Sequence, residues 1–167
     1  FYRWMASWAM ALRKPEDLGY DGQAFQLPPL IVKEHFIKTD WQRDGELFPG
    51  MGLRGITDRI SVRQQTTEAR SEYAAQLAND AGEQPIIWCG TNNESALITK
   101  LLKPYGAIEV RGSDDADVKE ERLLAFADGT IPILVTKAKI AGWGMNFQSA
   151  HHAIFLGLND SHELYYQ

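Results

Sequence analysis

The stretch "VTKAKIAGWGMNFQSAHHAIFLGLNDSHELYYQ", residues 135–167, joins two apolar runs through a segment with two glycines and an asparagine. The first run, 131–136, closes on a threonine, and the second covers 153–158. Short apolar runs bounded by turn residues are typical of strands buried inside a sheet. The pattern therefore predicts two strands, followed by the start of a helix at 160–167.

The same alternation continues upstream. Helical spacing of apolar residues alternates with short apolar runs, which predicts helices at 64–82, 93–106 and 113–129 and strands at 85–90 and 107–112. Strands separated by helices at this spacing indicate βαβ units. We therefore expect an α/β fold with a mainly parallel sheet sandwiched by helices.

The first third of the chain has a different character. We expect an aromatic-rich helix at 1–13, a turn-rich connector at 14–27, an extended strand at 28–38 and a long irregular segment at 40–61. The aromatic side chains either pack on the domain's own surface or contact a neighbour. The irregular segment is either a solvated loop or a hinge near a binding cleft.

Composition limits the class of protein. The net charge of −5 argues against coating nucleic acid by bulk charge, although a local phosphate-binding groove is compatible with it. The single cysteine, Cys89, excludes an internal disulfide and favours a reducing, intracellular location. No apolar stretch has the length of a membrane span. The absence of an initiator Met and the abrupt end at Gln167 suggest a piece of a longer polypeptide.

The ends of the predicted strands carry the candidate binding residues. In an open parallel sheet, ligands bind beyond the carboxyl ends of the strands. Small and polar residues occupy these positions: Gly90-Thr91-Asn92, Arg111-Gly112-Ser113, Thr136-Lys137 and Gly157-Leu158-Asn159-Asp160. They offer backbone N–H groups, hydroxyls or amides to phosphate oxygens, and helix N-termini favour anions.

Several catalytic motifs are missing from the chain. It has no GxxxxGK[ST] phosphate loop, no acidic pair after a strand to hold Mg²⁺, and no GxSxG elbow. His151 and His152 are adjacent and would point apart, so we expect no metal site. We therefore expect no catalytic residue in the chain by itself.

Two long segments resemble a known family. "PIIWCGTNNESALITKLL" and "EVRGSDDADVKEERLLAFADGTIPILVTKAKIAGWGMNFQSAHHAIFLGLNDSHELYYQ" are similar to the C-terminal RecA-like lobe of superfamily 2 helicases, closest to the Swi/Snf-like DEAD/DEAH group of phages and prophages. The resemblance covers about 66–167. It implies that residues 1–61 are a connector and appendage leaving a first lobe, and that 62–167 form the C-terminal lobe, truncated at the start of motif VI.

The resemblance also implies residue roles. The segment 136–148 is similar to motif V, and Gln167 to the first residue of motif VI. The implied contacts with the nucleic-acid backbone come from Gly90, Thr91, Arg111, Gly112, Thr136 and Lys137. The implied ATP-cleft and coupling residues are Gly142, Gly144, Asn146 and Gln167. Lys137 could equally be solvated, and Trp143 is either a wedge or part of the core.

The implied function is that of a fragment of an ATP-dependent helicase or translocase, with duplex DNA and the first lobe as partners. ATP and Mg²⁺ would be held by the full-length protein, of bacterial or phage origin and cytoplasmic, and the fragment alone would be inactive. The alternative is a non-catalytic Rossmann-like module that binds a nucleotide or a protein partner.

Overall fold

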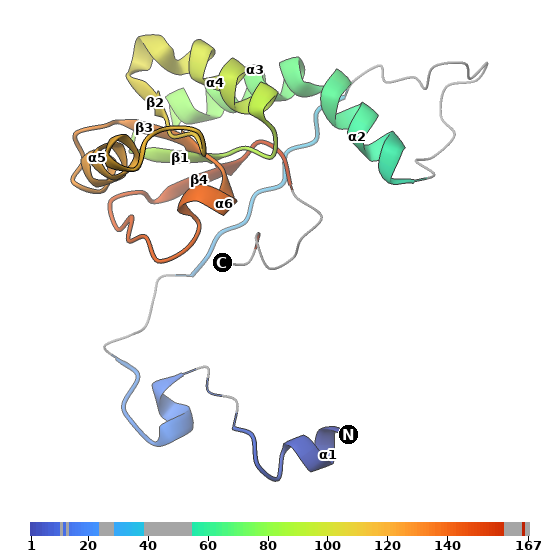
Figure 1. Cartoon of the computed structure of the whole chain (residues 1–167), viewed down its shortest axis with the longest axis vertical. Helices are drawn as coiled ribbons and strands as arrows, with labels where there is room; N and C mark the ends of the chain where they lie inside the picture. The colour runs from blue at the N-terminus through green and yellow to red at the C-terminus, as the bar shows by residue number, and fades with distance from the viewer. Residues whose placement is uncertain (11, 13, 24–28, 39–54, 159–164, 166–167) are drawn as a thin grey trace. The chain divides into compact units, whose positions relative to one another are not determined.

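The structure, a computed structural model, describes residues 1–10, 12, 14–23, 29–38, 55–158 and 165. The chain divides into two compact units, Phe1–Phe36 and Ile37–Gln167, and the second unit contains the whole sheet (Figure 1). The boundary that we predict between an appendage and a helicase lobe, at 61/62, stays a prediction.

The sheet has four strands in the order β2-β3-β1-β4, all parallel. The strands are β1 (Pro85–Trp88), β2 (Ala107–Glu109), β3 (Ile133–Thr136) and β4 (His152–Phe155). Ile87 lies opposite Val135 of β3 on one side and Ile154 of β4 on the other. The parallel α/β fold predicted from the sequence is confirmed.

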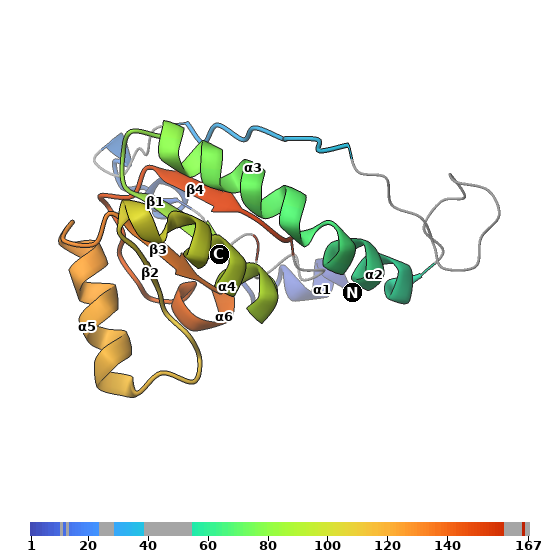
Figure 2. The same cartoon turned by 90° about the horizontal axis from the view of Figure 1, so that it is seen from above.

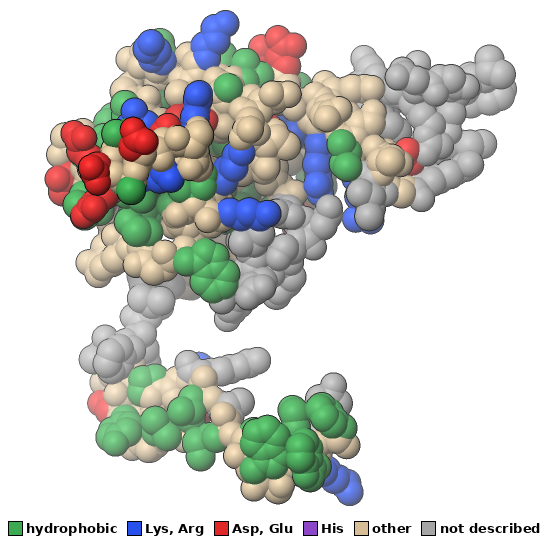
Figure 3. Space-filling view, viewed as in Figure 1, with side chains coloured by type: hydrophobic (Ala, Val, Ile, Leu, Met, Phe, Trp, Pro, Cys, Tyr) green, Lys and Arg blue, Asp and Glu red, His purple; other side chains and the backbone are tan. Residues whose placement is uncertain are grey.

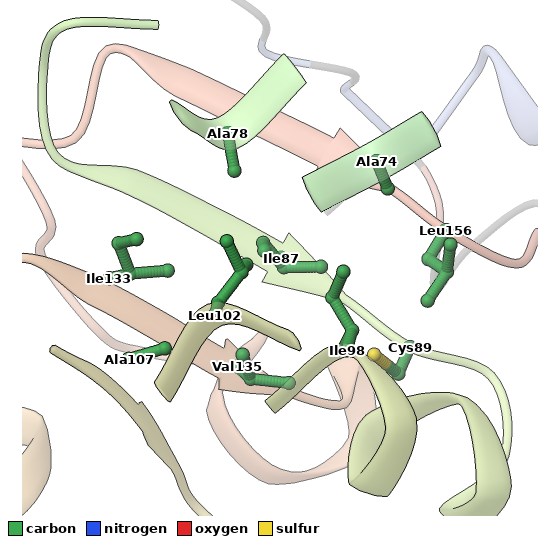
Figure 4. Close-up of a cluster of buried hydrophobic side chains, with 10 residues drawn as sticks. All are labelled: Ala74, Ala78, Ile87, Cys89, Ile98, Leu102, Ala107, Ile133, Val135 and Leu156. Atoms are coloured by element: carbon green, nitrogen blue, oxygen red, sulfur yellow. The ribbon is translucent and has the colours of Figure 1, made fainter. Parts of the chain in front are cut away.

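Helices cover both faces of this sheet. Alternate residues of a strand point to opposite faces, so Ile87 and Val135 join a cluster that packs under α3 (Thr67–Asp80) and α4 (Asn92–Leu102) (Figure 4). Ile86 and Leu134 face the other way, where they meet Phe126 of α5 (Ala116–Ala127). Ile87, Val135 and Phe126 are fully buried. Truncating one of them to alanine would cost about 2–5 kcal/mol.

Small side chains bring α3 close to its neighbours. Its buried positions are Ser71, Ala74 and Ala78, which recur every three or four residues and so lie on one helix face. α3 packs chiefly against α4, and the two helices run side by side above the sheet (Figures 1 and 2). A face of small residues lets two helix backbones approach closely.

The start of this helical region differs from our expectation. In place of one helix over 64–82, the structure has α2 (Ile56–Gln65) and α3, with a break at Thr66. The Thr66 hydroxyl donates back to the Val62 carbonyl oxygen at 2.7 Å and does not cap α3. The prediction of an irregular segment to residue 61 is therefore wrong from residue 56 onward, and 39–54 lie outside the described residues. α2 has little apolar periodicity, so its sequence gives no clear helical signal.

Other boundaries shift by a few residues. α4 ends early because Pro104 cannot continue the helix, and a 3₁₀ turn, Lys103–Tyr105, follows it. A one-turn helix that the sequence analysis did not predict, α6 (Ala138–Ala141), follows β3. The helix expected at 160–167 lies outside the described residues apart from Tyr165.

The first unit is less regular than expected. Helix α1 covers only Tyr2–Met5, so the predicted helix over 1–13 is wrong; a second short helix, of 3₁₀ type, spans Pro15–Leu18. Trp4 and Trp8 pack edge to face at 5.3 Å yet stay 62% and 64% exposed. A short helix rich in aromatic residues has a low intrinsic tendency to extend, because aromatic side chains lose rotamer freedom in a helix. Residues 29–38 form no strand, and none of the strands in the described part of the chain pairs with them.

Candidate functional site

The parallel sheet gathers the carboxyl ends of its strands at one edge. β3 lies between β1 and β2, so the loops that follow Trp88, Glu109 and Thr136 are neighbours. The strand ends and the loops that follow them contain six sequence-predicted site residues: Gly90, Thr91, Arg111, Gly112, Thr136 and Lys137.

The loop after β1 is closed by a residue that the sequence analysis missed, Glu94. Its Oε2 accepts hydrogen bonds from the backbone N–H groups of Gly90 at 2.9 Å and Thr91 at 3.0 Å. In return, the Thr91 hydroxyl accepts from the Glu94 N–H at 3.2 Å. The two N–H groups are therefore occupied inside the protein. The sequence carried a signal, since Thr91 and Glu94 have the spacing of a capping box.

The loop after β2 presents Arg111 at the surface. Arg111 Nη2 donates to the buried carboxylate of Glu109 at 2.6 Å, and the guanidinium stays 56% exposed. This hydrogen bond and the charge of Glu109 raise the pKa of Arg111 above its ordinary value. Asp114 accepts from the Arg111 N–H at 2.9 Å and from Arg122 Nη1 at 3.0 Å. These hydrogen bonds fix the turn, and the guanidinium of Arg111 places a positive charge on its solvent-exposed side.

The last residue of β3 is a buried candidate, and the first residue of the loop after it is an accessible one. Thr136 is fully buried, and its hydroxyl donates to the Val110 carbonyl oxygen at 3.2 Å. Lys137 is partly exposed, and its Nζ donates to the side-chain oxygen of Asn92 at the start of α4. This contact joins the loops after β1 and β3. Among the six predicted site residues at this edge, Lys137 and Arg111 are the two cations whose side chains reach solvent.

The segment after α6 contains three of the residues that the sequence analysis assigns to the ATP cleft. An added Cβ at Gly142 would collide with the Ala138 carbonyl oxygen, and Gly144 has a positive φ of 68°. Both positions therefore require glycine for local reasons. Asn146 is exposed, and Trp143 is 52% exposed, which removes Trp143 from the core. Gln167 lies outside the described residues.

A hollow of about 230 Å³ opens beside these loops, at the carboxyl ends of β1, β3 and β4. Lys137 and Lys139 line it together with three aromatic rings, Trp88, Phe155 and Tyr165. The rings of Trp88 and Phe155 stack with centroids 6.5 Å apart. Ligand pockets commonly enclose about 300–1,000 Å³. The hollow is therefore suited to part of a ligand.

Metal-ligating and thiol groups are the remaining candidates for chemistry. Within the described part of the chain, no group of three or more His, Cys, Asp or Glu side chains is placed to hold a metal ion. Cys89 borders the hollow, but burial and the nearby carboxylates of Glu94 and Glu109 raise its pKa to about 12. Its thiol therefore stays protonated and unreactive at neutral pH.

Charge is unevenly distributed over this unit. In Figure 3, most of the visible Asp and Glu atoms of this unit gather over α5. Lys and Arg atoms lie between α5 and α2 and also at the top of the view, above α4. The exposed acids at the start and on the surface of α5 are Asp115, Asp117, Glu120 and Glu121.

A parallel sheet with helices on both faces, and with polar loops at the carboxyl ends of its strands, defines this unit as a RecA-like α/β domain. The model of the helicase conserved C-terminal domain matches residues 69–167, more than half of the chain. The chain therefore belongs to this family. The family match confirms the prediction of a C-terminal helicase lobe, whereas the Swi/Snf-like, phage-type assignment stays a prediction.

Two solved structures are similar to this chain. The chain is similar to T4 UvsW, with a TM-score of 0.54 and 16% identity over 68% of this chain and 24% of that chain. It is also similar to the C-terminal part of the Fun30 ATPase domain, with a TM-score of 0.47 and 15% identity over 65% of this chain and 33% of that chain. The chain thus spans about a quarter to a third of the length of these two chains. No curated protein matches it.

One further property concerns membranes. Among the residues that the structure describes, no helix combines the length and the apolar character that a membrane span requires.

Proposed function

We propose that this chain is the second RecA-like lobe of an ATP-dependent helicase or translocase that acts on duplex DNA. The observation that carries the proposal is the shared edge of β1, β2 and β3, where Arg111 and Lys137 present cations to solvent. Family membership supports a helicase as the parent protein.

The contact with nucleic acid would use side chains more than backbone N–H groups. The N–H groups of Gly90 and Thr91 already donate to Glu94, and the Thr136 hydroxyl donates to Val110. Arg111 and Lys137 keep donors at the surface, and each phosphate contact by such a cation releases counterions. Binding would therefore be nonspecific in sequence and sensitive to salt.

The second half of the proposal is the nucleotide side. Gly142, Gly144, Asn146 and Gln167 would form one wall of an ATP cleft, and a first lobe in the same polypeptide would supply the other wall with the phosphate loop and the Mg²⁺ ligands. The residues that line the hollow beside Lys137 are different ones, so the hollow is not part of this proposed wall.

The remaining assignments follow from the same proposal. Residues 1–61 would connect the two lobes, and 62–167 would form the second lobe. The single buried Cys89 and the helicase family are consistent with a protein that works inside the cell.

The test uses the full-length protein, meaning this chain joined to the first lobe that we propose. We expect duplex DNA to stimulate its ATP hydrolysis, and Lys137→Ala and Arg111→Ala to weaken that stimulation. Lys103→Ala, an exposed cation at the opposite end of α4, is the matched control and should behave as the parent. ATP hydrolysis that no nucleic acid stimulates would contradict the proposal and favour a nucleotide-binding module of another kind.

A further inference from the structure

A buried ion pair connects the predicted backbone-contact loop to the helices that precede the sheet. Glu94 is only 1% exposed, and its Oε1 accepts from Arg70 Nη2 at 2.7 Å. A buried carboxylate is costly unless it is paired and hydrogen-bonded. The Glu94 carboxylate meets this condition. Arg70 donates to one of its oxygens, and the N–H groups of Gly90 and Thr91 donate to the other.

Arg70 extends this connection to three more places. Its Nη2 also donates to the Arg63 carbonyl oxygen at 2.7 Å, near the end of α2. Its Nε donates to the Thr66 hydroxyl at 3.1 Å, and its Nη1 donates to the Leu156 carbonyl oxygen just after β4. One guanidinium thus holds the α2–α3 break, the end of β4 and the start of α4.

The space around Glu94 is correspondingly tight. A Cβ added at Gly157 would lie 2.7 Å from both carboxylate oxygens of Glu94, and one added at Gly90 would lie 3.3 Å from Oε2. The loops after β1 and β4 therefore close on the same carboxylate. A displacement of that carboxylate would move both loops.

We propose that Arg70 and Glu94 are positioning residues that fix the loops after β1 and β4 relative to α2 and α3. The consequence for activity rests on the proposed function: these loops border Lys137 and Asn92, so their placement sets how well the edge of the sheet meets a nucleic-acid backbone. Neither side chain touches the nucleic acid itself. The pair therefore acts through Gly90, Thr91 and Gly157.

The geometry requires arginine at position 70. The planar guanidinium carries five donors in a fixed fork, which four separate acceptors use here. A lysine would keep the charge, but its three donors radiate from one atom and cannot reach the same acceptors. Glu94→Gln keeps the size and one acceptor oxygen and removes the charge.

The experiment compares Arg70→Lys and Glu94→Gln with a control in the full-length protein. The control is Glu83→Gln, which removes an exposed carboxylate that lies 3.7 Å from His152 at the opposite ends of the same two strands. Two quantities are measured: the exchange rates of the Gly90 and Thr91 amides, and the duplex DNA concentration that gives half-maximal stimulation of ATP hydrolysis.

We expect both pair variants to speed exchange at Gly90 and Thr91, while the Ile87 amide in the core stays as slow as in the parent. The half-maximal DNA concentration should rise by about tenfold, as for the loss of one charge-assisted hydrogen bond, with a smaller change in the rate at saturating DNA. Glu83→Gln should change neither quantity. Arg70→Lys, the milder substitution, keeps the test usable if Glu94→Gln unfolds.

The outcomes separate this inference from the proposed function. Unchanged exchange at Gly90 and Thr91 in a folded variant would overturn the positioning role. Faster exchange with an unchanged half-maximal DNA concentration would overturn its link to nucleic acid. If DNA does not stimulate the parent protein, the proposed function fails, and the exchange rates still decide whether the pair positions the loops.

Discussion

Gly157 lies directly against the carboxylate of Glu94, close enough that an added Cβ would sit 2.7 Å from both carboxylate oxygens. The two residues are far apart in sequence. Gly157 lies in the loop after β4, and Glu94 lies in the first turn of α4, which follows the loop after β1. Glu94 cannot move aside easily, because Arg70, Gly90 and Thr91 hold it. The contact explains why a glycine follows β4.

Gly157→Ala should therefore destabilise the chain, by about 1–3 kcal/mol, a typical cost of overpacking a buried site. Urea unfolding followed by circular dichroism measures the change. Gly112→Ala is the control, since the nearest atom to its added Cβ is a side-chain carbon of Ile140 at 4.0 Å. Equal stability of Gly157→Ala and the parent would contradict the packing described.

Removing the exposed cations at the edge of the sheet should reduce the salt dependence of DNA binding by the full-length protein. Arg111→Ala and Lys137→Ala should each lower the slope of log affinity against log salt by about one, because each loses one phosphate contact. Binding titrations at several salt concentrations provide the slopes. A slope unchanged in both variants would remove these residues from the interface, and Lys103→Ala serves again as control.

Asn146→Ala in the full-length protein should lower ATP hydrolysis in the presence of DNA and leave the fold intact, because Asn146 is exposed and carries no core contact. Loss of one positioned hydrogen bond corresponds to about 1–3 kcal/mol. Gln148→Ala, at an exposed position of the same segment, provides the comparison. Parental turnover by Asn146→Ala would refute its assignment to the ATP cleft.

Thr136→Ala should reduce stability, since the buried hydroxyl donates to the Val110 carbonyl oxygen, and it should lower DNA-stimulated ATP hydrolysis through the adjacent Lys137, which this hydrogen bond helps to place. The lost hydrogen bond is worth about 1 kcal/mol of unfolding free energy. Thermal unfolding and turnover are measured on the same sample. Loss of stability with parental turnover would assign Thr136 a structural role alone.

Cys89 should resist alkylation in the folded chain at pH 8 and react rapidly in denaturant, because burial raises its pKa from 9.0 to about 12. The folded state then retains a proton that the unfolded chain releases above pH 9. The associated stability is present below pH 9 and is lost as the pH rises from about 9 toward 12. Between pH 8 and pH 10, the free energy of unfolding should therefore fall by about 1 kcal/mol less in Cys89→Ala than in the parent. Equal alkylation rates in the folded and denatured chains would contradict this.

The 167-residue chain by itself should neither hydrolyse ATP nor unwind a duplex, because its sequence contains no phosphate loop and no acidic pair to hold Mg²⁺. Purified chain is assayed for phosphate release and strand separation, with and without DNA. Steady turnover that survives removal of contaminating ATPases would reveal a catalytic site not described above. Joining the chain to the proposed first lobe should restore both activities.

The sequence alone determined the parallel α/β class of the sheet-containing unit. Apolar runs such as "PIIW" and "ILVT" reveal buried strands through local composition, and the spacing of the helices between them indicates parallel pairing. The same information placed Arg111 and Lys137 at strand ends. It failed for α2 and for residues 1–13 and 29–38, where helix or strand formation depends on a partner surface more than on local pattern.

Only the tertiary structure decided which candidate groups remain available. Gly90, Thr91 and Thr136 have the right residue types at the right places, yet Glu94 and Val110 already use their donors. The pairing of Arg70 with Glu94 likewise has no sequence signal, because the two residues meet only after α3 packs on α4. A hydrogen bond depends on distance and direction in space, and these are set when the sheet and its helices close around the buried carboxylate.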